Sequence, residues 1–200
     1  MAARRFGARF RRALLYAARL HELQNAKGSE RPYLGHLLGV ASIVIQYDGD
    51  EDETIAALLH DAVEDQGGQP TLRTIRSRFG NRVAEIVWGC TDADTIPKPP
   101  WLERKKTYLA HLRSSKGRFS ASIRLVSAAD KLHNARQILA DYEVVGEKVW
   151  ARFKGRRDGT LWYYREVVKA LRSHGVNPLV AELTRTVREL ERTARARRSK

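Results

Sequence analysis

Four ionisable residues that could do chemistry lie close together in the chain. His60, Asp61, Glu64 and Asp65 follow the apolar stretch 54–59. On an α-helix, residues four positions apart share a face, so His60 would lie over Glu64 and Asp61 over Asp65. Such groups are costly at the end of an apolar helix unless something binds them. Imidazole and carboxylate together suit divalent ions such as Mn, Fe and Zn. We therefore interpret this cluster as part of a metal site.

Two simpler explanations of the cluster compete with a metal site. A His-Asp pair is common by chance, and acidic residues at a helix end can form a solvated surface. However, Glu64 and Asp65 would lie at the C-terminal end of the predicted helix, where the helix dipole disfavours negative charge. Local electrostatics therefore do not explain these carboxylates, which leaves function as an explanation.

Two other predicted helices each contribute one residue of a suitable type. His36 lies in one apolar helical stretch, and Asp130 lies among small apolar residues in another. A lone histidine on such a helix is more often a core residue than a ligand, whereas a buried carboxylate needs a partner. With the adjacent pair His60 and Asp61, they make up a candidate site of two histidines and two aspartates. Such a site leaves coordination positions open for water and substrate, as catalytic metal sites do.

The elements that must position these residues are all predicted to be helical. Apolar residues recur at helical spacing through most of the chain, and no segment alternates with period two for long enough to form a strand. We predict an all-α fold and a single domain over residues 1–200 with basic ends. The predicted helices cover residues 8–25, 33–47, from about 52 to 65, 71–79, 82–90, 101–112, 123–139, 143–153, 161–173 and 179–193.

The composition is that of a soluble globular protein. The 200 residues are 42% hydrophobic and 30% charged, enough for one domain with a sizeable core. No apolar run is long enough to span a bilayer, and no signal peptide follows the basic N-terminus. The single cysteine, Cys90, excludes an intrachain disulfide framework and a multi-cysteine zinc site. We expect a cytoplasmic protein that does not enter membranes.

The net charge of +14 predicts attraction to polyanions, either nucleic acid or phosphorylated small molecules. Bases gather in residues 1–20 and 192–200, whereas acids concentrate in residues 48–65. A negative centre within a positive surround suits a metal-dependent site for an anionic substrate. A basic protein with solvated ends would show the same distribution, so nucleic-acid binding through the ends stays open.

Four motifs make the chain similar to a known family. The order of His36, His60, Asp61 and Asp130 resembles the HD phosphohydrolase superfamily. In more detail, the sequence resembles the hydrolase domain of RelA/SpoT proteins, and in particular the small alarmone hydrolases, over a core of about residues 20–171. The motifs are Pro-Tyr-Leu-Gly-His-Leu-Leu-Gly-Val-Ala at 32–41, His-Asp-Ala-Val-Glu-Asp at 60–65, Trp-Leu-Glu-Arg-Lys at 101–105 and Ala-Asp-Lys-Leu-His-Asn-Ala-Arg at 129–136.

The resemblance implies a multi-helix HD-domain bundle that removes the 3′-pyrophosphate from (p)ppGpp-like nucleotides, usually with Mn²⁺. Because the matched length leaves no room for a synthetase domain, it implies hydrolysis only. Glu64 and Asp65 would orient and deprotonate the attacking water, Asn134 would contact the sugar, and Tyr164 would contact the nucleotide near the leaving phosphates. The implied metal ligands are His36, His60, Asp61 and Asp130.

Basic residues near the motifs are candidates for binding the leaving pyrophosphate, which carries several negative charges. We expect Arg104, Lys105 and Arg136 to serve this purpose, although each is equally well explained as a surface charge. The family usually carries adjacent Arg-Lys before the Pro-Tyr pair, whereas this chain has Ala26 and Lys27. Lysine cannot replace the planar forked guanidinium of arginine. An adenosine alarmone such as (p)ppApp is therefore as admissible as the guanosine one.

Two other functions remain open on the sequence alone. One is an HD phosphatase or phosphodiesterase acting on ordinary nucleotides, against which the Glu64-Asp65 pair and Asn134 count. The other is a non-catalytic module that senses nucleotides or binds nucleic acid on a retired HD scaffold. An HD domain that has lost catalysis normally lacks a metal ligand or the acid pair, whereas this chain has all four ligands and both acids. We interpret His133, three residues after Asp130, as structural rather than as a ligand.

Overall fold

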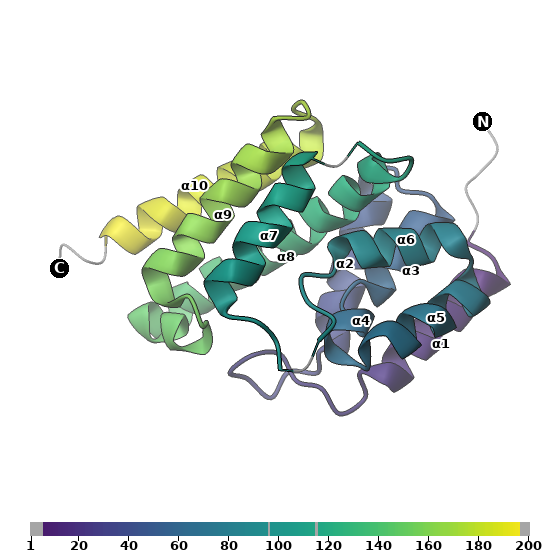
Figure 1. Cartoon of the computed structure of the whole chain (residues 1–200). Coiled ribbons are helices and arrows are strands. Elements are labelled where there is room, and N and C mark those ends of the chain that lie inside the picture. The colour runs from purple at the N-terminus through teal and green to yellow at the C-terminus, as the bar shows by residue number, and fades with distance from the viewer. Residues whose placement is uncertain (1–5, 96, 115, 197–200) are drawn as a thin grey trace.

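The structure, a computed structural model, describes residues 6–95, 97–114 and 116–196. The described residues form helices and no strand, apart from an isolated bridge between Asn25 and Pro32 (Figure 1). This confirms the all-α prediction; the basic ends 1–5 and 197–200 lie outside the described residues. The helices are α1 (Ala8–Leu20), α2 (Leu34–Gln46), α3 (Glu51–Leu59), α4 (Ala62–Asp65), α5 (Gly68–Phe79), α6 (Asn81–Cys90), α7 (Trp101–Ser114), α8 (Ser120–Val145), the 3₁₀ helix η1 (Gly146–Arg152), α9 (Arg156–Arg172) and α10 (Pro178–Ala196).

Helix α8 forms the axis of the molecule. It runs for 26 residues and packs against α2, α3 and α6 on one side and against α9, α10 and η1 on the other (Figure 1). Helix α1 packs on α3, α5 packs on α6, and α7 packs on α9. No helix of the described residues is both long and apolar enough to cross a membrane. The central position of α8 explains how one of its residues reaches a site built mainly from the first half of the chain.

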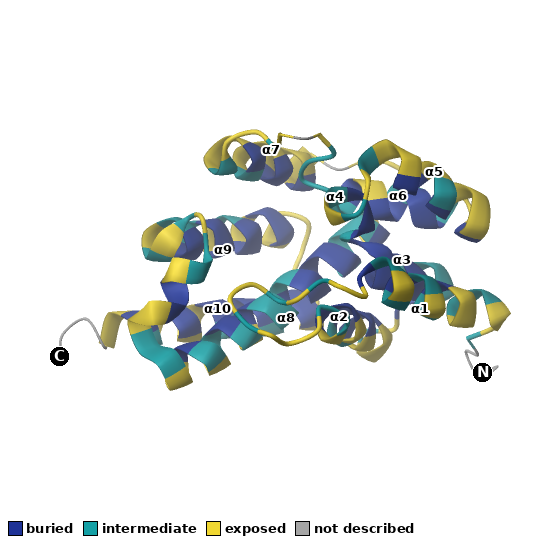
Figure 2. Cartoon of the chain, turned by 90° about the horizontal axis from the view of Figure 1, so that it is seen from below, coloured by how far each residue is buried: buried dark blue, intermediate teal, exposed yellow. Residues whose placement is uncertain are grey.

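Helix α3 is the most deeply buried part of the core. A capping box starts it: Glu53 N donates to Asp50 Oδ1 at 3.0 Å, and Asp50 N donates to Glu53 Oε2 at 2.8 Å. All residues from Thr54 to Leu59 are buried, as expected for a helix that is apolar on every side. Figure 2 shows that the buried residues of α3 lie beside those in the middle of α8. The apolar stretch therefore fixes the depth at which the following polar residues lie.

The predicted single helix over residues 52–65 is wrong. Helix α3 ends at Leu59 and α4 begins at Ala62, with Asp61 at φ −97° and ψ −1° between them. In a continuous helix, adjacent side chains would point about 100° apart. In the turn, His60 Nε2 lies 3.1 Å from Asp61 Oδ2. The turn therefore places the His60 and Asp61 donor atoms side by side.

Other predicted boundaries also differ from the structure: α1 ends at Leu20, for example, and not at residue 25. Helix α5 begins at Gly68 and not at residue 71, and the Thr71 hydroxyl donates to the Gln66 carbonyl at 2.6 Å. Helix α8 continues to Val145, and η1 follows where we predicted a helix over 143–153. Helix α9 includes Gly159, which lies against the Trp101 ring where a larger side chain would be crowded. Tertiary packing decides these boundaries rather than local propensity.

Candidate metal centre and active site

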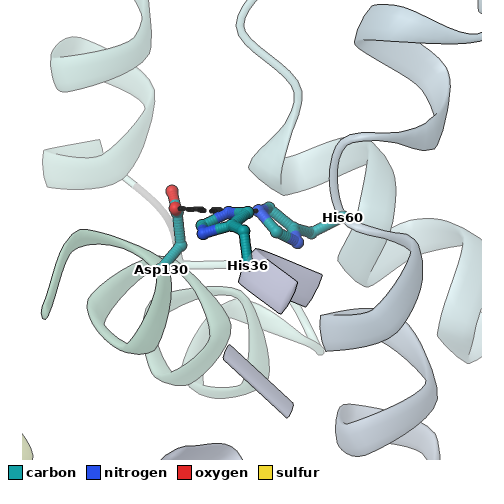
Figure 3. Close-up of side chains that lie close together, drawn as sticks. All are labelled: His36, His60 and Asp130. Carbon is teal, nitrogen blue, oxygen red and sulfur yellow. Dashed lines mark hydrogen bonds and ion pairs between the residues drawn. The ribbon is translucent and has the colours of Figure 1, made fainter. Parts of the chain in front are cut away.

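The four predicted metal ligands lie together beside α8. Helix α2 contributes His36, the turn between α3 and α4 contributes His60 and Asp61, and α8 contributes Asp130. His36 Nε2 lies 3.3 Å from His60 Nε2 and 3.4 Å from Asp130 Oδ1, and Figure 3 shows these three side chains pointing toward one another. Asp61 Oδ2 lies 3.1 Å from His60 Nε2 and 3.7 Å from His36 Nε2. Residues up to 94 positions apart thus converge on one point.

The spacing of these donor atoms fits a divalent transition metal. Ligand atoms about 2.1 Å from a metal ion lie about 3.0–3.4 Å from each other in octahedral or tetrahedral sites. The pairs described above lie 3.1–3.7 Å apart, and one donor atom from each of His36, His60 and Asp130 falls within 4.8 Å of the other two. A set of two imidazole nitrogens and two carboxylates suits Mn, Fe or Zn better than it suits Ca or Mg, which prefer sites made of oxygen ligands alone.

Both histidines are oriented by a partner on the far side of the ring. His60 Nδ1 lies 2.8 Å from the Ala57 carbonyl, which can only accept, so His60 carries its Nδ1 proton there and presents Nε2 to the cluster. His36 Nδ1 lies 2.9 Å from His133 Nδ1. The His133 ring fills the space beside Gly39, where no Cβ would fit. Sequence reasoning placed His133 in a structural role, and the structure makes it the partner of His36.

The two carboxylates are held in the same way. The Tyr33 hydroxyl donates to Asp61, and the Tyr33 ring lies 5.1 Å from the His36 ring between centroids. Asp130 accepts from Lys131 Nζ and from the Asn134 side-chain amide. The structure therefore places Asn134, a predicted contact of the substrate sugar, on Asp130 itself. Partners of this kind fix ligand orientation before a metal binds.

The electrostatics of the cluster favour a cation. Burial opposes charge on His60, but Asp61 and Asp130 outweigh burial and raise the His60 pKa well above its usual value. Burial lowers the pKa of His36 to about 4, and the neighbouring His60 adds to this effect. Burial is likewise outweighed at both carboxylates, whose pKa values lie well below the usual range because of the cations beside them. The two carboxylates therefore favour a positive charge beside the two imidazoles, which a bound metal cation would supply.

Glu64 and Asp65 lie next to the cluster at the end of α4. Lys98 Nζ joins them, at 3.0 Å from Glu64 Oε1 and 3.1 Å from Asp65 Oδ1. Burial and the negative charges of Asp92 and Asp61 raise the pKa of Glu64 to about 7. A carboxyl group with this pKa can both accept and release a proton near neutral pH.

Arg104 and Lys105 are not free to bind phosphate in the structure. Both donate to Asp92, whose side chain is only 4% exposed, and Arg104 Nη1 also lies 3.6 Å from Glu64 Oε1. Burial opposes ionisation of Asp92, but Lys105 and Arg104 outweigh it and lower the pKa to about 2. Arg104 and Lys105, both predicted to bind phosphate, are thus paired with Asp92 next to Glu64.

The remaining predicted substrate contacts are spread around the site. Lys27 is exposed in the loop between α1 and α2. Arg136 forms an ion pair with Glu182 of α10, away from the donor cluster. Tyr164 is buried in α9, with its ring 5.9 Å from the Tyr163 ring. The structure brings neither Arg136 nor Tyr164 into contact with the metal ligands in the interactions of the described residues, and their substrate roles stay predictions.

Sequence reasoning missed several residues that complete the site. Asp92 and Lys98 come from the loop between α6 and α7, and neither has a helical pattern to reveal it. Lys98 stands between prolines at 97 and 99, a rigid frame that could have indicated a positioned cation. Tyr33 belongs to a recognised motif but has no ligand atom that would suggest a metal.

We expect His133→Ala to weaken Mn²⁺ binding by about 10–100-fold, because His36 loses the partner that fixes its ring. His133→Asn should recover most of this loss, since the asparagine oxygen can accept the same hydrogen bond. Isothermal titration calorimetry measures the Mn²⁺ affinity of both variants. The exposed residue His111 provides the control variant His111→Ala. Equal affinity in His133→Ala and wild type would show that His36 needs no partner.

Comparison with known proteins agrees with this geometry. A model of the HD domain matches residues 13–161. The chain is 40% identical over 126 residues to the guanosine-3′,5′-bis(diphosphate) 3′-pyrophosphohydrolase MESH1 of Xenopus tropicalis, covering 62% of this chain and 65% of that protein. It is 33% identical over 173 residues to MESH1 of Drosophila melanogaster, covering 85% and 88%. A solved structure of a metazoan ortholog of SpoT that hydrolyses ppGpp superimposes with a TM-score of 0.77 at 30% identity, over 94% of this chain and 98% of that one.

These matches show that the chain belongs to the HD-domain family. Within that family, its resemblance to RelA/SpoT-type hydrolases is confirmed. The matched part of the chain spans slightly less than two thirds of the Xenopus relative, 65% of its length.

Proposed function

We propose that this protein is a metal-dependent hydrolase that removes the 3′-pyrophosphate from alarmone nucleotides, (p)ppGpp or (p)ppApp, in the cytoplasm. The observation that carries this proposal is the convergence of two histidines and two aspartates beside an acid pair, Glu64 and Asp65. The similarity to ppGpp hydrolases supports the substrate class.

His36, His60, Asp61 and Asp130 would hold the cation, for which we propose Mn²⁺. When bound, a divalent cation lowers the pKa of a water molecule on it and neutralises the negative charge of the phosphates. Glu64 would accept the proton of the attacking water, since its pKa of about 7 places both protonation states within reach. Asp65, which shares Lys98 with Glu64, would orient that water.

The charges around the acid pair would serve the leaving group. Lys98 lies at the acid pair itself, and Lys105 pairs with Asp92, which Arg104 links to Glu64. A substrate pyrophosphate competes with these carboxylates for the same cations, so binding would transfer charge-assisted hydrogen bonds from protein to substrate. We propose Lys27, Arg104, Asn134, Arg136 and Tyr164 as further substrate contacts.

The loop between α1 and α2 would face the nucleoside. It carries Ala26 and Lys27 where related sequences usually have Arg-Lys, and Ala26 cannot stack on a base or donate hydrogen bonds. We therefore propose that the enzyme discriminates weakly between guanine and adenine. The complete set of catalytic groups counts against a module that only senses nucleotides or binds nucleic acid.

The proposal is tested by offering ppGpp, ppApp and a 3′-mononucleotide to the Mn²⁺-loaded protein. We expect turnover of both alarmones with kcat/KM values within about tenfold of each other, which is about 1.4 kcal/mol of discrimination, and none of the mononucleotide. Turnover of the mononucleotide alone would identify a general phosphatase instead. The variant Ala26→Arg should shift preference toward one base.

The pH dependence of turnover should reflect the protonation of the Glu64 carboxyl group. Burial and Asp92 raise its pKa to about 7, so the basic form that accepts a proton is lost as pH falls below 7. We expect kcat/KM to fall about tenfold per pH unit below that point. Asp92→Asn removes a negative charge near Glu64 and should move this limb to lower pH. A pH profile of Asp92→Asn that coincides with wild type would contradict the assignment of Glu64 as the base.

A further inference from the structure

A half-buried glutamine outside the predicted site, Gln24, contacts one of the two acids. Gln24 lies just after α1, and its Nε2 donates to Asp65 Oδ2 at 2.9 Å. On its other side, Gln24 Oε1 lies 2.6 Å from Gln66 Nε2 and 2.7 Å from His21 Nδ1. Four polar side chains thus form one connected network that ends on Asp65.

The chemistry of the groups fixes the orientation of the Gln24 amide. An ionised carboxylate can only accept hydrogen bonds, so the group that faces Asp65 must be the NH₂ of Gln24. The Gln24 oxygen then faces Gln66 and His21, both of which must donate. Rotating the amide by 180° would set oxygen against oxygen at Asp65 and NH₂ against NH₂ at Gln66. The contact with Asp65 therefore fixes one orientation of the Gln24 amide.

The segment that carries Gln24 is itself anchored. Gln24 N donates to the His21 carbonyl at 3.0 Å, and Tyr33 N donates to the Gln24 carbonyl at 2.8 Å, which closes the base of the loop before α2. His21 is only 2% exposed, and its ring lies 5.5 Å from the Tyr33 ring between centroids. The Tyr33 hydroxyl donates to Asp61. One anchored segment therefore supports both a metal ligand and an acid.

Asp65 needs such support more than Glu64 does. The Asp65 side chain is 28% exposed, against 21% for Glu64, and it belongs to the last residue of the four-residue helix α4. Gln24 holds Oδ2 and Lys98 holds Oδ1 at 3.1 Å, from segments on opposite sides of Asp65 in the sequence. Lys98 is a cation that an anionic substrate would draw away, whereas the neutral Gln24 amide has no such attraction.

We propose that Gln24 is a positioning residue that keeps the Asp65 carboxylate aligned while Lys98 turns to the substrate. The inference rests on the proposed role of Asp65 in hydrolysis. It predicts that Gln24 acts on turnover through Asp65 and leaves metal binding alone. A residue that merely stabilised the fold would affect these properties without regard to Asp65.

The test is a double-mutant cycle on Gln24 and Asp65. We expect Gln24→Leu to lower kcat by about 10–100-fold, with KM for ppGpp within about twofold and Mn²⁺ affinity unchanged. In the Asp65→Ala background, Gln24→Leu should cause no further loss, since residues that act through one another are not additive. Gln24→Glu keeps the shape of the side chain but replaces the donor with an acceptor, and should lose the same turnover. Additive losses in the cycle would overturn the proposal.

A surface pair provides the matched control. Gln69 Nε2 donates to Asp94 Oδ2 at 2.8 Å, so Gln69→Leu removes a similar glutamine–aspartate bond that involves neither Glu64 nor Asp65. We expect wild-type kcat, KM and Mn²⁺ affinity from Gln69→Leu. A loss of kcat in Gln69→Leu as large as in Gln24→Leu would overturn the proposal.

A second measurement separates this inference from the proposed function. In the NMR spectrum of the wild-type protein, the Gln24 side-chain amide protons should be shifted and slow to exchange, and Asp65→Ala should remove both properties. This readout needs no substrate, so it stands even if no alarmone is hydrolysed. Identical Gln24 amide signals in wild type and Asp65→Ala would overturn the inference, whereas failure of wild-type turnover alone would count against the proposed function.

Discussion

Replacing His60 or Asp61 with alanine should abolish Mn²⁺ binding and alarmone hydrolysis together. The two donor atoms lie 3.1 Å apart and within 3.7 Å of His36 Nε2, so either change removes one of the four proposed protein ligands. His60→Ala also removes the imidazole that lies beside both Asp61 and Asp130. Because His60 is buried, nearby groups cannot replace it.

Calorimetric Mn²⁺ titration and a ppGpp assay on the same preparations measure this effect. We expect no detectable heat of binding and no detectable turnover from either variant, with unchanged helical content by circular dichroism. His111→Ala, an exposed histidine on α7, serves as the control and should match wild type. A His60→Ala protein that hydrolyses ppGpp at the wild-type rate would rule out the metal centre proposed here.

The acid pair should behave differently from the ligands. Glu64→Gln and Asp65→Asn preserve side-chain shape and remove the charge that would accept or orient a proton. Positioned general bases contribute about 10²–10⁴-fold to turnover, and we expect losses in that range. Mn²⁺ affinity should remain within about threefold of wild type, since neither side chain is among the four clustered donors.

Measuring kcat and metal affinity in parallel distinguishes these roles. Loss of Mn²⁺ binding in Glu64→Gln would show that Glu64 is a metal ligand. Wild-type turnover by Glu64→Gln would show that Glu64 has no catalytic role. The surface variant Glu85→Gln, at an exposed ion pair with Arg76, provides a control of the same type. We expect Glu85→Gln to retain wild-type turnover.

Periodicity and motif spacing predicted much of this molecule. The all-α fold follows from apolar residues at helical spacing, which local sequence records directly. The approach of His36, the 60–61 pair and Asp130 was predicted from residue type and order, because buried carboxylates and imidazoles on apolar helices need partners. What these signals share is that each one is visible within a short stretch of sequence.

The features that sequence reasoning missed depend on contacts between distant segments. The break between α3 and α4 cannot be read from periodicity, because the apolar pattern ends where the polar cluster begins. The pairing of Arg104 and Lys105 with Asp92 depends on how the loop before α7 folds back. The contact of Gln24 with Asp65 joins residues 41 positions apart in the chain. Such contacts appear only once the helices are packed.

The central claim is that this site releases intact pyrophosphate from the 3′ position of an alarmone. The most direct measurement is ³¹P NMR of the products formed from ppGpp by the Mn²⁺-loaded protein, with the metal-free protein alongside. We expect GDP and pyrophosphate in equal amounts, formed only with the metal. Release of orthophosphate in place of pyrophosphate, or equal turnover without metal, would contradict it.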